Sequence, residues 1–134
     1  MAVTMARATK THRPTYSGAH TFDFAGKDFL NTTEFSQEEF VELVERALSL
    51  KREGYVRQLL AGTVLGMVFF NPSLRTKTAL ASGVARHGGT TIDLTVGQGM
   101  YTFEFGDGVV MDGATQEHIK EAAPVLAQYC NVIG

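Results

Sequence analysis

The side chains best suited to binding chemistry lie in one octapeptide, residues 71–78, which reads Asn-Pro-Ser-Leu-Arg-Thr-Lys-Thr. It brings Arg75 together with the hydroxyl groups of Ser73 and Thr76. A guanidinium can hold a phosphate through two parallel hydrogen bonds, and the free N–H groups at the start of a helix attract the same anion. If a helix begins here, these residues predict a phosphate site. The alternative is an ordinary turn in which Arg75 is a solvated surface charge.

The segments that flank this octapeptide predict a strand before it and a helix after it. Residues 63–70 form a short apolar run with β-branched and aromatic side chains, as in a buried strand. Pro72 breaks the strand because its ring fixes φ and removes a backbone donor. Ser73 is a candidate N-cap for a helix that runs to Arg86. The apolar face of that helix comprises Leu74, Leu80, Ala81, Val84 and Ala85. The glycine pattern of a Walker A loop is missing from the octapeptide.

Another helix is predicted nearer the N-terminus, and a second strand follows the phosphate-site helix. Ser36 and Glu39 have the spacing of a capping box, and apolar residues recur at helical spacing to about Lys51. Gly54 is expected to end that helix. Residues 90–96, rich in β-branched side chains, predict the second strand.

Residues 97–113 predict a long loop, because they hold five glycines and show no clear periodicity. A short strand is expected at residues 109–111 within it. Asp112 or Thr115 is expected to cap the next helix, in which Pro124 predicts a kink or a late start. The apolar face of that helix comprises Ile119, Ala122, Ala123, Leu126 and Tyr129.

Strands that alternate with helices predict an α/β fold, a parallel sheet with flanking helices on both faces. Residues 131–133 are expected to add one more strand to this sheet. Ligands of such sheets bind beyond the carboxyl ends of the strands. The turn at residues 73–76 falls at such an end, so fold and chemistry point to the same place.

Composition limits the class of protein. A length of 134 residues suits a single domain, and a net charge of −2 gives no reason to expect a nucleic acid partner. No apolar run approaches the roughly 20 residues of a membrane-spanning helix. The one cysteine, Cys130, cannot form an internal disulfide and is expected to be a buried thiol. No cluster of side chains suggests a metal ion.

The first 22 residues differ in charge from the rest of the chain. They carry Arg7, Lys10 and Arg13 but no acidic residue. Their weak apolar periodicity predicts a flexible leader at residues 1–22. The alternative is an organelle transit peptide, which is also acid-poor. Residues 23–134 would then form the folded domain.

Several blocks resemble the aspartate/ornithine carbamoyltransferase superfamily. Residues 69–76, with the Ser-x-Arg-Thr core at Ser73, resemble its carbamoyl phosphate signature. Together with residues 29–32, 110–113 and 117–119, they resemble the branch that acts on N-acetylornithine or N-succinylornithine. The similarity runs in order from about Phe29 to Gly134. It implies a carbamoyl phosphate-binding domain that needs no cofactor.

The resemblance assigns roles to single positions. Ser73, the backbone of Leu74, Arg75 and Thr76 are implied to bind carbamoyl phosphate, with Arg75 and Thr76 also reaching the carbonyl oxygen in catalysis. Lys77 stands where the family usually has a second arginine. This change keeps a positive charge but loses the planar fork.

Two further positions are implied to matter. Tyr101 takes the place of a tryptophan that reaches into the site of the neighbouring subunit. The resemblance implies that Tyr101 binds carbamoyl phosphate there and that the protein is a homo-oligomer, a trimer. The alternative is that Tyr101 packs with Met100, Phe103 and Phe105. Gln116 takes the place at which acetylornithine enzymes have Glu and succinylornithine enzymes Pro. It is either the specificity residue for the acyl group or a solvated residue in the first turn of a helix. His118 is expected to cap or to lie on the surface.

The family has a second domain that binds the amino acid, and its residues do not follow Gly134 in this sequence. The chain is therefore expected to be an N-terminal fragment that lacks turnover alone. The expected activity is cytoplasmic carbamoyl transfer to N-acetyl-L-ornithine in arginine biosynthesis. The alternatives are N-succinylornithine or ornithine as acceptor, or a non-catalytic anion-binding module. Neither nucleic acid nor membrane is an expected partner.

Overall fold

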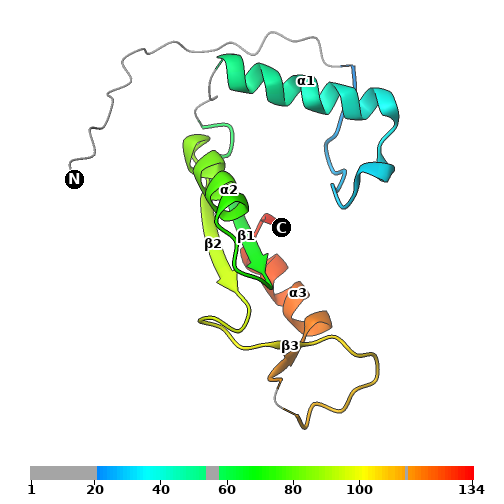
Figure 1. Ribbon diagram of the computed structural model, residues 1–134, viewed down its shortest axis with the longest axis vertical. Helices are drawn as coiled ribbons and strands as arrows, with labels where there is room; N and C mark the ends of the chain where they lie inside the picture. The colour runs from blue at the N-terminus through cyan, green and yellow to red at the C-terminus, as the bar shows by residue number, and fades with distance from the viewer. Residues whose placement is uncertain (1–20, 54–57, 114) are drawn as a thin grey trace, which may run out of the picture. The chain divides into compact units, whose positions relative to one another are not determined.

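A computed structural model describes residues 21–53, 58–113 and 115–134 of the chain (Figure 1). The described residues fall into two compact units, residues 21–53 and residues 58–134 without residue 114. None of the helices in the described ranges is long and apolar enough to cross a membrane.

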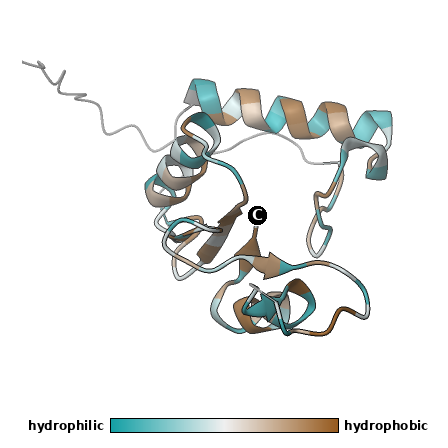
Figure 2. Cartoon of the chain, turned by 60° about the horizontal axis from the view of Figure 1, so that its bottom comes forward, coloured by the Kyte–Doolittle hydropathy of each residue, from teal (hydrophilic) through white to brown (hydrophobic). Residues whose placement is uncertain are grey.

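The first unit is built on a short 3-10 helix, η1 (Thr32–Glu34), and on α1 (Gln37–Glu53). The predicted capping box at the start of α1 is confirmed. The N–H of Glu39 donates to Ser36 Oγ at 3.2 Å, and the Glu39 carboxylate accepts from the Ser36 N–H at 2.8 Å. The helix continues two residues beyond the expected end at Lys51, and Gly54 lies outside the described residues. Figure 2 shows apolar and polar bands along α1, whose apolar residues remain half exposed.

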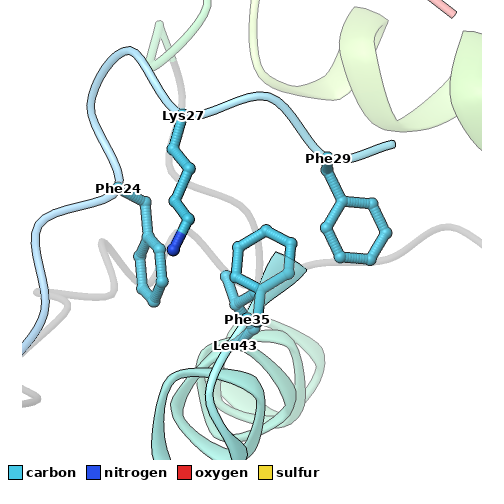
Figure 3. A pocket seen from close by; sticks show the side chains of 5 residues that line it. All are labelled: Phe24, Lys27, Phe29, Phe35 and Leu43. Atoms are coloured by element: carbon cyan, nitrogen blue, oxygen red, sulfur yellow. The ribbon is translucent and has the colours of Figure 1, made fainter. Parts of the chain in front are cut away.

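Aromatic side chains ahead of α1 enclose a shallow pocket of about 270 Å³. Lys27 extends into this group, with its ammonium 4.6 Å from the centre of the Phe35 ring and 2.8 Å from the Glu39 carboxylate (Figure 3). The cation is therefore held by an ion pair and by a ring face together. The pocket is lined by Phe24, Lys27, Phe29, Phe35 and Leu43.

The predicted leader lies outside the described residues except for its last two. The N–H groups of Thr21 and Phe22 donate to the carboxylate of Glu42 on α1, at 3.1 and 3.5 Å. Arg46 donates to the carbonyl oxygen of Phe22 at 2.6 Å and pairs with Glu42 one turn away. The chain at residues 21–22 is thus tied to the middle of α1.

The second unit contains the predicted parallel sheet, which is confirmed. Its strands are β1 (Val64–Phe69), β2 (Thr90–Thr95) and β5 (Val132–Ile133), in the order β2-β1-β5. Both neighbours pair with β1 in parallel, with Phe69 opposite Thr95 at one end of the sheet. No boundary of these three strands differs from its predicted position by more than one residue.

Helices flank this sheet. The helix α2 (Arg75–Arg86) packs Leu80 and Val84 against Leu65 and Met67 of β1, which form the buried core. Successive residues of a strand face opposite ways, so Gly66 faces the other side. There it lies against Cys130, the buried residue that ends α3 (Ile119–Tyr129). Cys130 is therefore the buried thiol that the sequence predicts.

The remaining strands differ from prediction. No strand forms at residues 109–111, and Val110 is 72% exposed. Instead β3 (Phe103–Glu104) pairs in parallel with β4 (Glu117–His118), because Phe103 supplies the buried side chain that anchors the pair. The prediction at residues 109–111 followed apolar residue type alone. In the segment beside them, a Cβ atom added at Gly106 would lie 2.5 Å from the Val109 side chain, so only glycine fits there.

The start of α3 also differs from prediction. Its N-cap is neither Asp112 nor Thr115 but His118, whose Nδ1 accepts from the N–H of Lys120 at 3.1 Å. α3 begins at Ile119, later than either predicted cap would place it, so the expected late start is seen, although Pro124 still lies inside the helix. The predicted apolar face is correct for Ala122, which is buried, whereas Tyr129 is 71% exposed.

Candidate functional site

The candidate site is the turn between β1 and α2, at the carboxyl end of the central strand (Figure 1). Ser73 is half-buried, whereas Leu74, Arg75 and Thr76 are exposed. The structure therefore places four of the five predicted carbamoyl phosphate residues together in one turn, and the fifth, Tyr101, lies in the loop at residues 97–113.

The cap of α2 differs from prediction. Leu74, not Ser73, occupies the N-cap position, with φ −91° and ψ −56°, and no side chain caps this helix end. A capping side chain needs an extended backbone at the boundary residue itself. Leu74 already has a helical backbone, and the first helical bond runs from the N–H of Thr78 to its carbonyl oxygen at 3.0 Å. Ser73 lies one residue too early to cap.

The uncapped end leaves donors for a ligand. The N–H groups ahead of Thr78 have no acceptor within the helix, and the helix dipole makes this end positive. Arg75 forms none of the ion pairs found among residues 21–53, 58–113 and 115–134. The exposed residue Arg75, the free N–H groups and the hydroxyl-bearing residues Ser73 and Thr76 are therefore found together at one helix end. Such a set of donors suits a phosphate group.

Lys77 belongs to the same turn but has protein partners. Its ammonium contacts both carboxylate oxygens of Asp93 on β2, at 2.6 and 2.9 Å, and also the hydroxyl group of Thr95. The ammonium also lies 5.1 Å from the centre of the Phe69 ring. Lys77 is therefore bound to the sheet, unlike Arg75.

The loop that carries Tyr101 lies beside the end of β1. The rings of Phe70 and Phe105 meet edge to face, with their centres 5.5 Å apart. Tyr101 packs its ring edge-on against Phe103 at 5.9 Å, and its hydroxyl group donates to the carboxylate of Glu117. This hydrogen bond and the nearby negative charge raise the pKa of Tyr101 above its usual value.

Backbone donors also hold this loop. The N–H groups of Gly106 and Phe105 donate to the Glu104 carboxylate at 2.9 and 2.8 Å. They lower the pKa of Glu104, because they stabilise its charged form. His118 accepts from Lys120 with Nδ1, so its Nε2 carries the proton and donates to the carbonyl oxygen of Gly106 at 3.1 Å. The prediction that His118 is a capping residue is confirmed.

Gln116 is exposed and directly precedes β4. The alternative that placed it in the first turn of a helix is wrong, since α3 begins at Ile119. The hydroxyl group of Tyr101 donates to Glu117, the residue that follows Gln116. In the described residues no hydrogen bond or ion pair links Tyr101 or Gln116 to the turn at residues 73–76.

Sequence reasoning missed the partners of these side chains. Asp93 is a charged residue inside a β-branched strand, and its alternation with Thr91 and Thr95 was a usable signal that one face is polar. Glu117 carried no such signal, because its contact with Tyr101 depends on the path of a loop. Within the described ranges, no group of three or more His, Cys, Asp or Glu residues could hold a metal ion.

The chain is similar to known carbamoyltransferases. Over 108 residues the chain is 42% identical to an N-acetylornithine carbamoyltransferase of Xanthomonas campestris pv. campestris. This alignment covers 81% of the chain and 32% of that relative. Over 68 residues it is 43% identical to an N-succinylornithine carbamoyltransferase of Bacteroides fragilis, covering 51% of the chain and 21% of the relative. The chain thus spans about a third or less of the length of these relatives.

A solved structure shows the same fold. An acetylornithine transcarbamylase complexed with acetylcitrulline matches with a TM-score of 0.76 and 42% sequence identity, over 81% of this chain and 32% of that one. The family model for the carbamoyl phosphate-binding domain of aspartate/ornithine carbamoyltransferases matches residues 27–134. The resemblance seen in the sequence is therefore confirmed, and the chain belongs to the aspartate/ornithine carbamoyltransferase family through its carbamoyl phosphate-binding domain.

Proposed function

We propose that this chain supplies the carbamoyl phosphate site of a carbamoyltransferase that acts on N-acetyl-L-ornithine in arginine biosynthesis. The observation that carries the proposal is the uncapped start of α2, where Arg75 has no acidic partner among the described residues. It lies at the carboxyl end of β1, in a chain whose residues 27–134 match a carbamoyl phosphate-binding domain. Residues 23–134 are proposed to be that domain, and residues 1–22 a leader.

The proposed reaction places charge at two points. The side-chain amine of the acceptor attacks the carbonyl carbon of carbamoyl phosphate, the C–O bond to phosphate breaks, and the amine loses a proton. Negative charge grows on the carbonyl oxygen and on the departing phosphate, so fixed donors at both points lower the barrier. Ser73, the Leu74 N–H, Arg75 and Thr76 are proposed to hold the phosphate. Arg75 and Thr76 also donate to the carbonyl oxygen.

The choice between an acetylated and a succinylated acceptor rests on how many residues align with each kind of relative. The chain aligns with the N-acetylornithine enzyme over 108 residues and with the N-succinylornithine enzyme over 68. The acetylated acceptor is therefore proposed first. Gln116 is proposed as a residue that faces the acyl group. Its neutral amide does not repel a second carboxylate, so N-succinylornithine is the acceptor to compare.

A complete enzyme is proposed to be a cytoplasmic homotrimer in which Tyr101 reaches the site of a neighbouring subunit. The exposed apolar side chains in the same loop support this arrangement, because they include Phe105 at 54% and Val110 at 72%. Aromatic and aliphatic groups left on a surface mark positions where protein–protein contacts form.

The test is a carbamoylation assay with ornithine, N-acetylornithine and N-succinylornithine as acceptors. It compares the 134-residue chain with the product of the complete gene. We expect the product of the complete gene to carbamoylate N-acetylornithine fastest and the 134-residue chain to show no turnover. Arg75→Ala should abolish the activity, whereas Arg52→Ala, an exposed cation in the last turn of α1, should not. Phosphate binding without carbamoylation of any acceptor would instead identify a non-catalytic anion-binding module.

A further inference from the structure

The first turn of α2 carries two cations in different surroundings. Arg75 is exposed and has no acidic partner in the described part of the chain. The side chain of Lys77 is only 19% exposed, and its ammonium lies 2.6 Å from the Asp93 carboxylate. Two positive charges that are two residues apart on one helix thus have separate environments.

The ammonium of Lys77 has no donor left for a ligand. It carries three N–H groups, and it has three acceptors within hydrogen-bonding distance. Two are the carboxylate oxygens of Asp93, and the third is the hydroxyl group of Thr95. The Phe69 ring covers it further, with its centre 5.1 Å away.

These acceptors lie on the strand that borders the candidate site. Asp93 pairs in register with Met67, and Thr95 with Phe69, the last residue of β1. Asp93 is two residues from the end of β2, which is about 7 Å along the strand. Its carboxylate also lies 2.6 Å from the ammonium of Lys77, which is two residues from Arg75 on α2, so its negative charge is close to an anion bound at that turn.

We propose that Lys77 and Asp93 form a positioning pair, in which Lys77 fixes the first turn of α2 to β2 and cancels the charge of Asp93 instead of binding the anion. The effect of the pair on anion binding rests on the proposed function, whereas the link between α2 and β2 does not. Arg75 is then the cation of this turn that the phosphate meets. The family resemblance does not say what Lys77 does. In the structure its ammonium binds Asp93 and Thr95 of β2.

The pair can be tested by comparing Lys77→Met, Asp93→Asn and the double variant in a calorimetric titration with inorganic phosphate. Lys77→Met leaves the Asp93 carboxylate uncompensated near the anion, so the affinity should fall about tenfold, as expected for a charge at this distance in a partly exposed site. The double variant removes both charges and should recover most of the lost affinity. Lys77→Arg keeps the ion pair and should stay close to the wild type.

Direct binding of phosphate by Lys77 predicts a different pattern. The double variant would then remain as weak as Lys77→Met, because the loss of the ammonium could not be offset by removing Asp93. That result would overturn the role in charge cancellation.

A second measurement judges the link between helix and strand without any ligand. Thermal unfolding of the wild type, the two single variants and the double variant gives the coupling between the two side chains. The pair predicts that the double variant loses no more stability than the worse single variant. Losses that simply add would show that the two residues do not interact, and would overturn the positioning role. A wild-type chain that binds no phosphate but shows this coupling would reject the proposed function alone.

Discussion

Tyr101 donates a hydrogen bond from its hydroxyl group to the carboxylate of Glu117, sixteen residues further along the chain. The contact fixes the start of the glycine-rich loop to β4 and lies directly beside Gln116, the predicted specificity residue. The same tyrosine packs against the buried Phe103. The packing role considered for Tyr101 is thus seen within the chain, and its role in a neighbouring subunit stays a prediction.

This contact predicts an unusual titration of Tyr101. Its pKa is raised above the ordinary tyrosine value of 10.0, first by the hydrogen bond to Glu117. A raised pKa in the folded state means that the contact stabilises the fold at neutral pH and that this contribution is lost as the pH rises through the raised pKa. In an alkaline titration followed by absorbance, one tyrosine should ionise only above the ordinary tyrosine pKa, as a late component. Tyr101→Phe should remove it, and Tyr129→Phe, at an exposed position, should not. An unchanged late component in Tyr101→Phe would contradict the contact.

The carboxylate of Glu104 predicts a loss of stability in acid. Its pKa lies below the ordinary glutamate value of 4.5, first because the Gly106 N–H donates to it and then because of the Phe105 N–H. A lowered pKa contributes stability above the ordinary value, and the contribution is lost as the pH falls through the lowered pKa. Glu104→Gln should therefore unfold at a lower temperature than the wild type at pH 7. The two proteins should converge in strong acid.

The control for this comparison is Glu45→Gln, on the exposed surface of α1. It should match the wild type at pH 7. A Glu104→Gln protein as stable as the wild type at pH 7 would show that the two backbone hydrogen bonds add nothing to stability.

The close approach of α3 to the sheet predicts a steric effect at Gly66. A Cβ atom there would lie 2.8 Å from Cys130 Sγ. Gly66→Ala should therefore lower the free energy of unfolding by about 1–3 kcal/mol, as overpacking does in other cores. Adding Cys130→Ala removes the sulfur and should restore much of the loss. Chemical denaturation would measure all three proteins.

Gly83 offers a matched control for that substitution. It lies in α2, and a Cβ atom added there would meet no other atom within 4 Å. Gly83→Ala should stabilise the chain by about 0.5–1 kcal/mol, the usual gain from alanine within a helix. If both substitutions stabilise the chain, the contact between Gly66 and Cys130 is not as close as described.

The capping box of α1 predicts a stability loss in the first unit. Ser36→Ala removes the acceptor of the Glu39 N–H, which lies 3.2 Å from Ser36 Oγ. The expected cost is about 1 kcal/mol of helix stability. Circular dichroism during urea unfolding would detect it, with Ser82→Ala in the exposed part of α2 as the control. Equal losses in the two variants would contradict a specific role for the cap.

The parts of the fold set by local pattern could be predicted from sequence. The capping box of Ser36 and Glu39 and the apolar run of β1 have fixed spacing that needs no tertiary information. The caps of α2 and α3 could not be predicted. Ser73 is the better capping residue type, yet the backbone becomes helical at Leu74. His118 caps α3 because β4 ends there and leaves its ring beside the Lys120 N–H.

The same division holds for the candidate site. The turn at residues 73–76 was predictable, because strand, proline, arginine and hydroxyl groups are consecutive in the chain. The different partners of Arg75 and Lys77 were not, since they depend on the register that brings Asp93 beside α2. Two cations of the same turn can be distinguished only once the neighbouring strand is in place.

The central claim is that the start of α2, together with Arg75, binds the phosphate of carbamoyl phosphate. The most direct test is a calorimetric titration of the 134-residue chain with carbamoyl phosphate, alongside Arg75→Ala and the control Arg52→Ala. We expect saturable binding by the wild type and by Arg52→Ala, and an affinity at least about tenfold weaker in Arg75→Ala, as for the loss of one charged hydrogen bond. Equal affinity in Arg75→Ala and the wild type, or no binding by either, would contradict it.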